Sequence, residues 1–476
     1  MFRFCLGLSL AAATALMVWS LIQAQEQRPQ PPPNGEGLVV HEWGTFTTVQ
    51  GSDGVVLDGL RHEERDLPAF VHDIRDFAGI SGVSPKMETP VIYFYSDRQR
   101  KIKVRVNFTR GVITQWYPAA DSVNHQGMTV NGAAEKPAGR EITDLKDGYI
   151  EWGGSNDLMI LAPGATEDTQ LANGKGANSQ IKIELPRVAE DDPWRFCREV
   201  DANTLRVCNL NLARKQGGEG VVNEYEKCLF YRGLGDFPLP LKAVVRSDQY
   251  HESPLTRADG KVVGTMRTVK LALELTNTGK FGALTHALIV YKRGGFSGFH
   301  YVGDIKDSAD WEDLVISLDD ASETTEQLVK LLTEKLTLTG LYEKEALAMA
   351  RTWQQGYFND EGLRVFYVLP RDFVDWELPV TMDAGDGWTY GKHKQAKAIP
   401  FVRTFVARCD LLTPSREAEL AALVDKAASG DEEALAGLDR WGRFAIPYLK
   451  RVLQLAGNEA TRALAQCKLD EMKLRR

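Results

Sequence analysis

Three histidine–acid pairs follow one another near the start of the folded part of the sequence. They are His41-Glu42, His62-Glu63 and His72-Asp73. Imidazole and carboxylate together form a ligand set that suits Zn²⁺ or Fe²⁺. His41, His62 and His72 are therefore candidate ligands of one divalent metal cofactor. No HExxH motif or other recognised ligand spacing accompanies them, and the alternative is that they are ordinary core and surface histidines.

Carboxylates beside aromatic rings offer a second kind of chemistry. Most glycosidases use a pair of acids that flank the scissile bond, and sugar-binding sites stack tryptophan rings on the sugar. The candidate catalytic acids are Glu42, Glu88 and Glu151, and the candidate ligand-binding tryptophans are Trp43 and Trp152. Large aromatic residues are usually buried, so structural roles in the core are the alternative.

Arg232 ends an apolar strand and is followed by a glycine turn, Gly233-Leu234-Gly235. In a functional role this arginine would clamp an anionic ligand. The structural alternative is a buried ion pair with a nearby acid, for which Glu199, Asp201 and Glu226 are available.

Several common motifs are absent from the sequence. It contains no GxSxG elbow, no P-loop, no GxGxxG after a strand and no EF-hand loop. These absences argue against the common serine hydrolases, nucleotide-dependent enzymes and loop-type calcium binders.

The elements that must position these residues begin after an export signal. Arg3 precedes an apolar run from Phe4 to Ile22, and cleavage after Ala24 is expected, so residues 1–24 are predicted to be a signal peptide. The chain is then periplasmic or extracellular. Because the run is long enough to span a bilayer, an uncleaved membrane anchor is the alternative. No second stretch of this kind follows, so no membrane span is expected after cleavage.

The mature chain is mildly acidic. The full sequence has 57 basic and 65 acidic residues, a net charge of −8; residues 1–24 contain one base (Arg3) and no acid, so removing them leaves 56 and 65, a net charge of −9. This balance argues against nucleic acid or an anionic membrane as the main partner. A proline-rich segment, residues 25–37, is expected to be an extended tether.

Strand patterns dominate the chain from residue 38 to residue 310. Residues 102–108 alternate strictly between apolar and polar side chains, which predicts a strand with one buried face. If Val40–Thr47 is a strand, His41 and Trp43 share one face while Glu42 and Phe46 share the other. The sequence therefore predicts antiparallel β-sandwich-like units, with a possible seam between two units near residues 173–178.

Helical spacing appears later in the chain. Residues 324–338 and 343–355 carry apolar stripes, with Gly340 between them as a C-cap glycine. An α+β unit is expected at 311–412 and a helical cap at 413–476. Within the cap, the stretch 435–453 resembles the helix pair of a HEAT repeat. The predicted fold class is thus α+β, rich in strands.

Five cysteines remain after signal cleavage. They are Cys197, Cys208, Cys228, Cys409 and Cys467. Cys197 and Cys208 flank a turn, so a hairpin disulfide between them is geometrically possible in an oxidising compartment. Buried reduced thiols are the alternative, and the sequence does not decide the pairing.

Four motifs together resemble a family of uncharacterised exported bacterial proteins. The motifs are His41–Thr47, Met87–Tyr95, Phe230–Gly235 and Gly362–Arg371 with Val402-Arg403. The resemblance implies a location in the envelope of an environmental bacterium. It implies no activity and no catalytic residue, because no activity is known for the family.

We therefore expect a non-catalytic binding or interaction protein whose partner is a protein or glycan of the cell envelope. The alternative is a hydrolase, metal-dependent or based on an acid pair, that acts on an extracytoplasmic substrate such as a glycan.

Overall fold

The strand predicted from the alternating residues 102–108 is present as β6 (Lys103–Phe108). Val104, Val106 and Phe108 are buried, and the residues between them are partly exposed. The alternation places one face of β6 against the core and leaves the other to solvent.

The computed structural model describes residues 37–60, 67–73, 79–80, 83–125, 128–129, 141–142, 145–168, 181–209, 222–354, 356–391 and 397–474. The predicted signal peptide, the predicted seam near residues 173–178 and His62 lie outside these ranges. So does the predicted tether, apart from Gly37.

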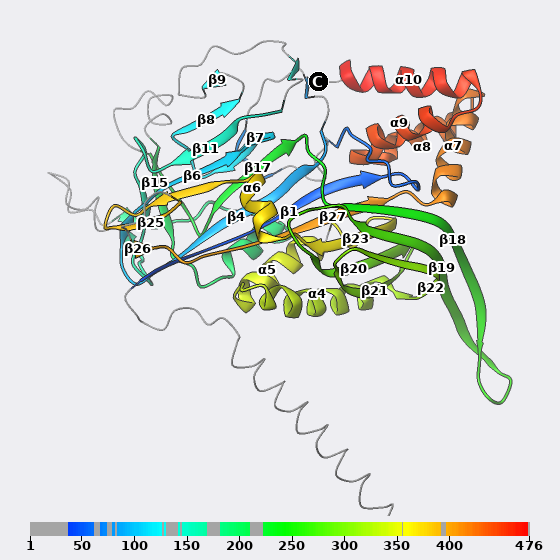
Figure 1. Ribbon diagram of the computed structural model, residues 1–476, viewed down its shortest axis with the longest axis horizontal. Helices are drawn as coiled ribbons and strands as arrows, with labels where there is room; N and C mark the ends of the chain where they lie inside the picture. Colours follow the sequence, from blue (N-terminus) through cyan, green and yellow to red (C-terminus); the bar gives the residue numbers. More distant parts are fainter. Residues whose placement is uncertain are drawn as a thin grey trace, which may run out of the picture.

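Within the described ranges, twelve strands form one large sheet (Figure 1). Its pairs are antiparallel except for one parallel pair, β1 with β27. In spatial order the strands are β18 (Leu241–Thr256), β19 (Val262–Asn277), β22 (Ser308–Asp320), β21 (Phe296–Ile305), β20 (Leu284–Arg293), β23 (Gly362–Val368), β27 (Phe401–Leu411), β1 (Leu38–Gln50), β4 (Lys86–Ser96), β17 (Leu229–Gly235), β7 (Gly111–Tyr117) and β2 (His72–Asp73).

The other described strands form four smaller sheets. The seven-stranded sheet consists of β26 (Lys397–Ala398), β25 (Trp388–Tyr390), β24 (Val380–Asp383), β6, β11 (Gly148–Trp152), β8 (Ser122–His125) and β9 (Met128–Thr129). The four-stranded sheet consists of β16 (Val222–Glu226), β15 (Leu205–Asn209), β12 (Leu158–Ile160) and β5 (Arg100–Lys101). Two-stranded pairs join β10 (Glu141–Ile142) to β3 (Gly79–Ile80) and β13 (Glu167–Asp168) to β14 (Ile181–Lys182).

The large sheet continues across residue 310, where the sequence placed a boundary between a β-rich body and an α+β unit. Residue 310 itself lies inside β22. From the later part of the chain, β23 pairs with β20, and β27 pairs with β1. The two parts are therefore joined by continuous backbone hydrogen bonding.

Strand β1 lies near the middle of this sheet and is covered on both faces. Val40 and Phe46 pack into a core shared with the seven-stranded sheet, whereas Trp43 packs into a second core shared with the helices α4 (Ala321–Leu338) and α5 (Glu343–Gln354). The predicted division of this strand into two faces is confirmed. A strand that is buried on both faces must place its polar side chains inside the protein.

The two predicted helices after residue 320 are present as α4 and α5, and they lie side by side against the large sheet (Figure 1). The Asp320 side chain caps α4 by accepting a hydrogen bond from the Ser322 N–H at 2.9 Å. Gly340 follows α4 with φ of +105°, a conformation that favours glycine. Thr339 is the C-cap residue, and Gly340 occupies the next position, where a glycine commonly ends a helix; the predicted end of the helix at Gly340 is confirmed.

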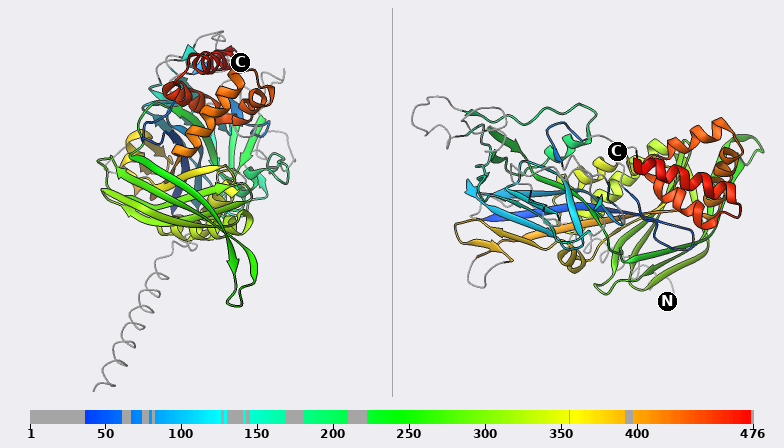
Figure 2. Two further views of the ribbon diagram at one scale, coloured as in Figure 1. Left: turned by 90° about the vertical axis from the view of Figure 1, so that its right-hand side faces the viewer. Right: turned by 90° about the horizontal axis from the view of Figure 1, so that it is seen from above.

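The C-terminal part of the chain is helical, as the sequence predicts. They gather at one end of the large sheet, opposite α4 and α5 (Figures 1 and 2). Leu420, Val424, Leu438 and Leu449 form a separate core with Val49 at the end of β1. The helices are α7 (Pro414–Ala428), α8 (Glu432–Leu438), the 3₁₀ segment η2 (Asp439–Phe444), α9 (Ala445–Leu455) and α10 (Glu459–Leu474).

Two further short helices complete the described fold: the 3₁₀ helix η1 (Pro193–Arg198) and α6 (Arg371–Glu377). Among the helices that the structure describes, none combines the length and the apolar character needed to cross a membrane.

The packing of the C-terminal helices can be tested with two leucines of α9. Leu449 is fully buried in the core beneath these helices, whereas Leu455 is 47 % exposed. We expect Leu449→Ala to lower the free energy of unfolding by about 2–5 kcal/mol because it leaves a cavity. The matched change Leu455→Ala should stay within about 0.5 kcal/mol. Urea denaturation followed by circular dichroism measures both, and equal values would contradict the packing.

Candidate functional site

His41 binds a carboxylate that the sequence analysis did not single out. Its Nδ1 lies 2.7 Å from Oε2 of Glu345 on α5. Glu345 is fully buried and also accepts hydrogen bonds from the Tyr95 hydroxyl at 2.7 Å and the Tyr342 N–H at 2.8 Å. Burial and the Glu345 carboxylate raise the pKa of Tyr95 well above its usual value. His41 is thus part of a buried network that ties β1 to α5.

A signal for Glu345 is present in the sequence. Glu345, Met349 and Trp353 follow one another at intervals of four residues, so they lie along one face of α5. Met349 and Trp353 are buried in the core on that face. An acid in an apolar helical stripe needs a buried partner, and His41 on β1 supplies it.

Glu42 points to the opposite face of β1 and forms a buried ion pair with Arg403 of β27. It also accepts a hydrogen bond from the Tyr231 hydroxyl. Burial alone would lower the pKa of Arg403, but the Glu42 carboxylate raises it above its usual value. Arg403 additionally donates to Asp375 at 2.8 Å. Glu42 is therefore part of a buried structural network with Arg403 and Tyr231.

His72 lies at the edge of the large sheet, away from His41. Its Nε2 is 2.9 Å from Oε1 of Glu224, and its ring stacks on Trp116 and Tyr117. The two described histidines of the predicted metal set are therefore hydrogen-bonded to different carboxylates, His41 to Glu345 and His72 to Glu224. Among the described residues, no group of three or more His, Cys, Asp or Glu side chains is arranged to hold a metal ion.

The predicted sugar-binding pair on β11 is divided between surface and core. Glu151 forms ion pairs with Lys103 at 2.9 Å and Arg105 at 3.6 Å on the partly exposed face of the seven-stranded sheet. Trp152 is fully buried, and its indole N–H donates to the Pro118 carbonyl at 2.9 Å. Trp43 is also fully buried. In this conformation neither tryptophan presents a ring face to a ligand.

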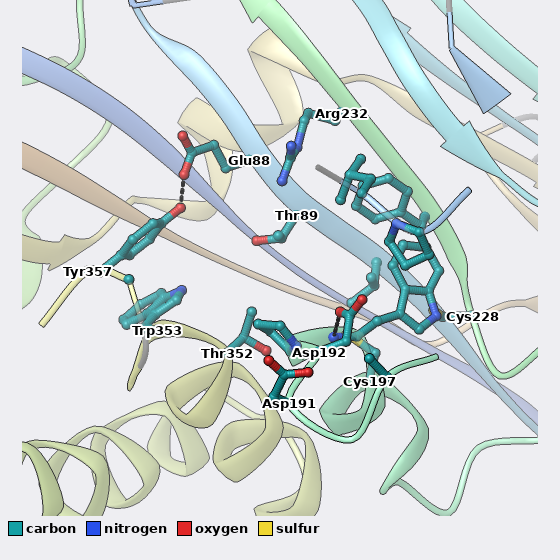
Figure 3. A pocket seen from close by; sticks show the side chains of 18 of the residues that line it. Glu88, Thr89, Asp191, Asp192, Cys197, Cys228, Arg232, Thr352, Trp353 and Tyr357 are labelled. Atoms are coloured by element: carbon teal, nitrogen blue, oxygen red, sulfur yellow. Dashed lines mark hydrogen bonds between the residues drawn. The ribbon is translucent and has the colours of Figure 1, made fainter. Parts of the chain in front are cut away.

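Glu88 and Arg232 come together in a cavity of about 290 Å³ (Figure 3). They belong to the neighbouring strands β4 and β17, which brings residues far apart in the sequence to one place. Aromatic side chains from η1, β17 and the end of α5 form much of the wall. The lining residues are Leu67, Pro68, Lys86, Glu88, Thr89, Val91, Ala189, Asp191, Asp192, Pro193, Trp194, Cys197, Cys228, Phe230, Arg232, Thr352, Trp353, Gly356 and Tyr357.

A bulge in β4 shapes the cavity. Trp43 of β1 pairs with Val91 of β4, and the next pair is Thr45 with Glu88. This step covers two residues on β1 and three on β4, so β4 has one extra residue there. Within the bulge, Thr89 has φ of +54°. A β-branched residue in this left-handed region is strained by about 1–3 kcal/mol. Bulges and strained residues concentrate at functional sites, where they redirect side chains.

Glu88 is held at the inner end of the cavity. It accepts a hydrogen bond from the Tyr357 hydroxyl, and its Oε1 lies 3.3 Å from Nζ of the buried Lys86. Burial and the Glu88 carboxylate raise the pKa of Tyr357 well above its usual value. The Tyr357 ring stacks on Trp353 and lies 4.5 Å from the Arg408 guanidinium. These contacts fix the positions of Glu88 and Tyr357.

The mouth of the cavity has a different character. Asp191 is exposed, and Asp192 accepts a hydrogen bond from the Trp194 N–H at 2.9 Å and so caps η1. Figure 3 shows these two acids with Thr352 at the end of the cavity away from Glu88 and Arg232. The cavity is therefore acidic at its mouth and holds two cations and one acid at its inner end.

Two cysteines of the cavity wall, Cys197 and Cys228, carry reduced thiols. Burial raises the pKa of Cys197 to about 12 and the pKa of Cys228 well above its usual value. Both thiols are therefore protonated at neutral pH and are poor nucleophiles. The hairpin disulfide between Cys197 and Cys208 is not formed; Cys208 lies on β15, opposite Asn223.

Comparison with known proteins adds little to this geometry. No protein-family model matches the chain, and no curated protein sequence matches it. Among solved structures, the chain is similar to the Fcho1 mu-homology domain of Danio rerio with a bound Eps15 peptide, at 8 % identity over 79 % of this chain and 98 % of that chain, with a TM-score of 0.26. The yeast delta-COP-I mu-homology domain with a Dsl1 WxWxV peptide matches at 7 % identity over 80 % and 100 %, with a TM-score of 0.22. Similarity at these TM-scores supports no conclusion about fold or function.

The structural role of Glu42 can be tested by comparison with Glu151. Glu42→Gln keeps the side-chain size but removes the fully buried carboxylate that faces Arg403, which leaves the partly exposed Asp375 as its remaining acidic partner among those described above. We expect the free energy of unfolding to fall by about 3 kcal/mol. Glu151→Gln disturbs only partly exposed ion pairs and should change it by at most about 1 kcal/mol. Urea denaturation of both variants measures the difference, and a stable Glu42→Gln variant would show that this pair is dispensable.

Proposed function

We propose that this protein is an exported binding protein whose ligand site is the cavity between the β4 bulge, β17, η1 and α5. The observation that carries the proposal is the convergence of Glu88 and Arg232 on one cavity beside the strained Thr89. A preformed cavity with aromatic walls and a few fixed polar groups is the usual form of a small-molecule site.

The charges in the cavity indicate the chemistry of the ligand. At the inner end Lys86 lies against Glu88, and with Arg232 the three side chains leave an excess of one positive charge, which favours an anionic group such as a carboxylate. Asp191 and Asp192 at the mouth favour a cationic or hydroxyl group on the same ligand. A volume of about 290 Å³ fits a molecule of amino-acid or monosaccharide size. The end of an envelope peptide or an acidic terminal sugar has these properties.

The export part of the proposal rests on the sequence. The apolar run 4–22 with Arg3 before it has the organisation of a signal peptide, and the proline-rich residues 25–37 would separate the folded part from the membrane during or after export. An envelope location would also bring the cavity close to peptides and glycans of the cell surface.

A hydrolase has less support from the geometry. His41 and His72 are held by Glu345 and Glu224, respectively, in separate parts of the fold. Of the three candidate acids Glu42, Glu88 and Glu151, only Glu88 lines the cavity. The arrangement of these side chains therefore favours binding over an acid-pair or metal-assisted reaction.

Blocking the mouth of the cavity tests the binding proposal. Free amino acids, dipeptides, uronic acids and neutral monosaccharides are screened against the full chain by saturation-transfer NMR, and affinities are measured by calorimetry. We expect an amino acid, dipeptide or uronic acid to bind, and Thr352→Trp to weaken its binding by at least about tenfold by filling the mouth.

Glu343→Trp is the matched control, because Glu343 is exposed at the start of the same helix α5 and does not line the cavity. The control should bind as the unchanged chain does. Binding that survives Thr352→Trp, or a screen without any binder, would contradict the proposal.

Export is tested separately by expressing the full chain in a Gram-negative host and fractionating the cells. We expect the protein in the periplasmic or extracellular fraction with an N-terminus at Gln25, because cleavage after Ala24 removes the apolar run. N-terminal sequencing of the purified protein measures this. A chain that retains residues 1–24 and sediments with membranes would instead be an anchored protein.

A further inference from the structure

The hairpin of β18 and β19 extends beyond the rest of the large sheet (Figures 1 and 2). These strands pair with each other as far as Thr256 and Val262. On its other side, β19 pairs with β22 only from Arg267 onward. Residues 253–266 therefore form a two-stranded ribbon, and such a ribbon is only marginally stable in water on its own. We call residues 253–266 the hairpin tip.

The hairpin tip exposes several large aliphatic side chains. Leu255, Val262, Val263 and Met266 are each between 45 % and 59 % exposed. Single exposed apolar residues are ordinary, but a group of four at the end of one projecting element indicates a contact surface.

Two basic residues lie beside these aliphatic side chains. Arg257 and Lys261 occupy the turn, which is closed by backbone hydrogen bonds between them and from Gly260 to Arg257. Asp259, the one acid of the tip, accepts a hydrogen bond from the Lys261 N–H. The tip thus carries two bases and one acid, whereas the whole chain has a net charge of −8.

We propose that the hairpin tip docks on the surface of a bilayer that contains anionic phospholipid. Leu255, Val262, Val263 and Met266 would enter the boundary between headgroups and acyl chains, and Arg257 and Lys261 would bind lipid phosphates. Buried aliphatic area and bases near anionic headgroups both favour interfacial membrane binding. The net charge of the whole chain argues against a membrane as the main partner, but the local charge of the tip has the opposite sign.

A protein partner fits the tip less well. A stable protein interface buries about 800 Å² on each partner, and four half-exposed side chains on a narrow ribbon fall short of this area. Pairing of the tip with a strand of a second chain is also disfavoured. The edge strand is β18, and its Pro254 has no backbone N–H to donate to such a strand. A bilayer needs neither a large area nor a free strand edge.

Hydrogen–deuterium exchange on the full chain tests the proposal locally, so that membrane binding by residues 4–22 does not obscure the result. Vesicles of phosphatidylethanolamine and phosphatidylglycerol, and vesicles of phosphatidylcholine alone, are added to separate samples. We expect slower exchange in peptides that cover 253–266 with the anionic vesicles and unchanged exchange with the neutral ones.

Variants connect this protection to the tip. Val262→Asp with Val263→Asp should weaken vesicle binding of the tip by at least about tenfold, judged from the lipid concentration that gives half-maximal protection. Val315→Asp is the control, because Val315 is 56 % exposed on β22 in the same sheet but lies away from the tip. The control should keep the protection of 253–266.

Three outcomes would overturn the proposal. The first is unchanged exchange at 253–266 with anionic vesicles. The second is equal protection by phosphatidylcholine vesicles, which would remove the role of Arg257 and Lys261. The third is protection that rises with protein concentration in the absence of vesicles, together with a dimeric mass, which would assign the tip to a second copy of the chain.

Discussion

The structure depends on the pairing of polar side chains that lie inside it. Strands β1 and β27 run through the middle of a sheet that is covered on both faces, and β4 lies beside them. Their polar side chains cannot reach bulk water, and an unpaired charge in such a place is strongly destabilising. Glu42 is paired with Arg403, and His41 with Glu345. The Glu42–Arg403 pair joins two neighbouring strands of the sheet, whereas the His41–Glu345 contact joins the sheet to α5 and so helps to place the helical layer.

The cavity is a consequence of the same arrangement. The His41–Glu345 contact holds the start of α5 against β1, and the far end of α5 then supplies Thr352 and Trp353 to the cavity wall. Opposite this end, the bulge at Thr89 interrupts β4 and exposes Glu88 to the same space. The site is thus built from the end of a helix and a defect in a strand, both positioned by the buried core.

The cavity and the hairpin tip use side chains in different ways. In the cavity, charged groups are fixed by neighbours, as Glu88 is by Lys86 and Tyr357, which suits the selective binding of a small ligand. At the hairpin tip, Leu255 and Val262 are exposed on a ribbon that has no third strand. Such a surface suits the proposed contact with a lipid bilayer, because a bilayer is fluid and adapts to the shape of the tip.

The sequence by itself determined the local features of this protein. The alternation at 102–108 predicted β6, and the helical stripes around Gly340 predicted α4 and α5, because periodicity and capping depend only on near neighbours. Tertiary structure alone decided which distant residues meet. The pairing of β1 with β27 and the contact of His41 with Glu345 join parts of the chain more than 300 residues apart. The convergence of Glu88 and Arg232 likewise requires β4 and β17 to be neighbours in the sheet. No local sequence pattern encodes that strand order, because packing of the whole core selects it.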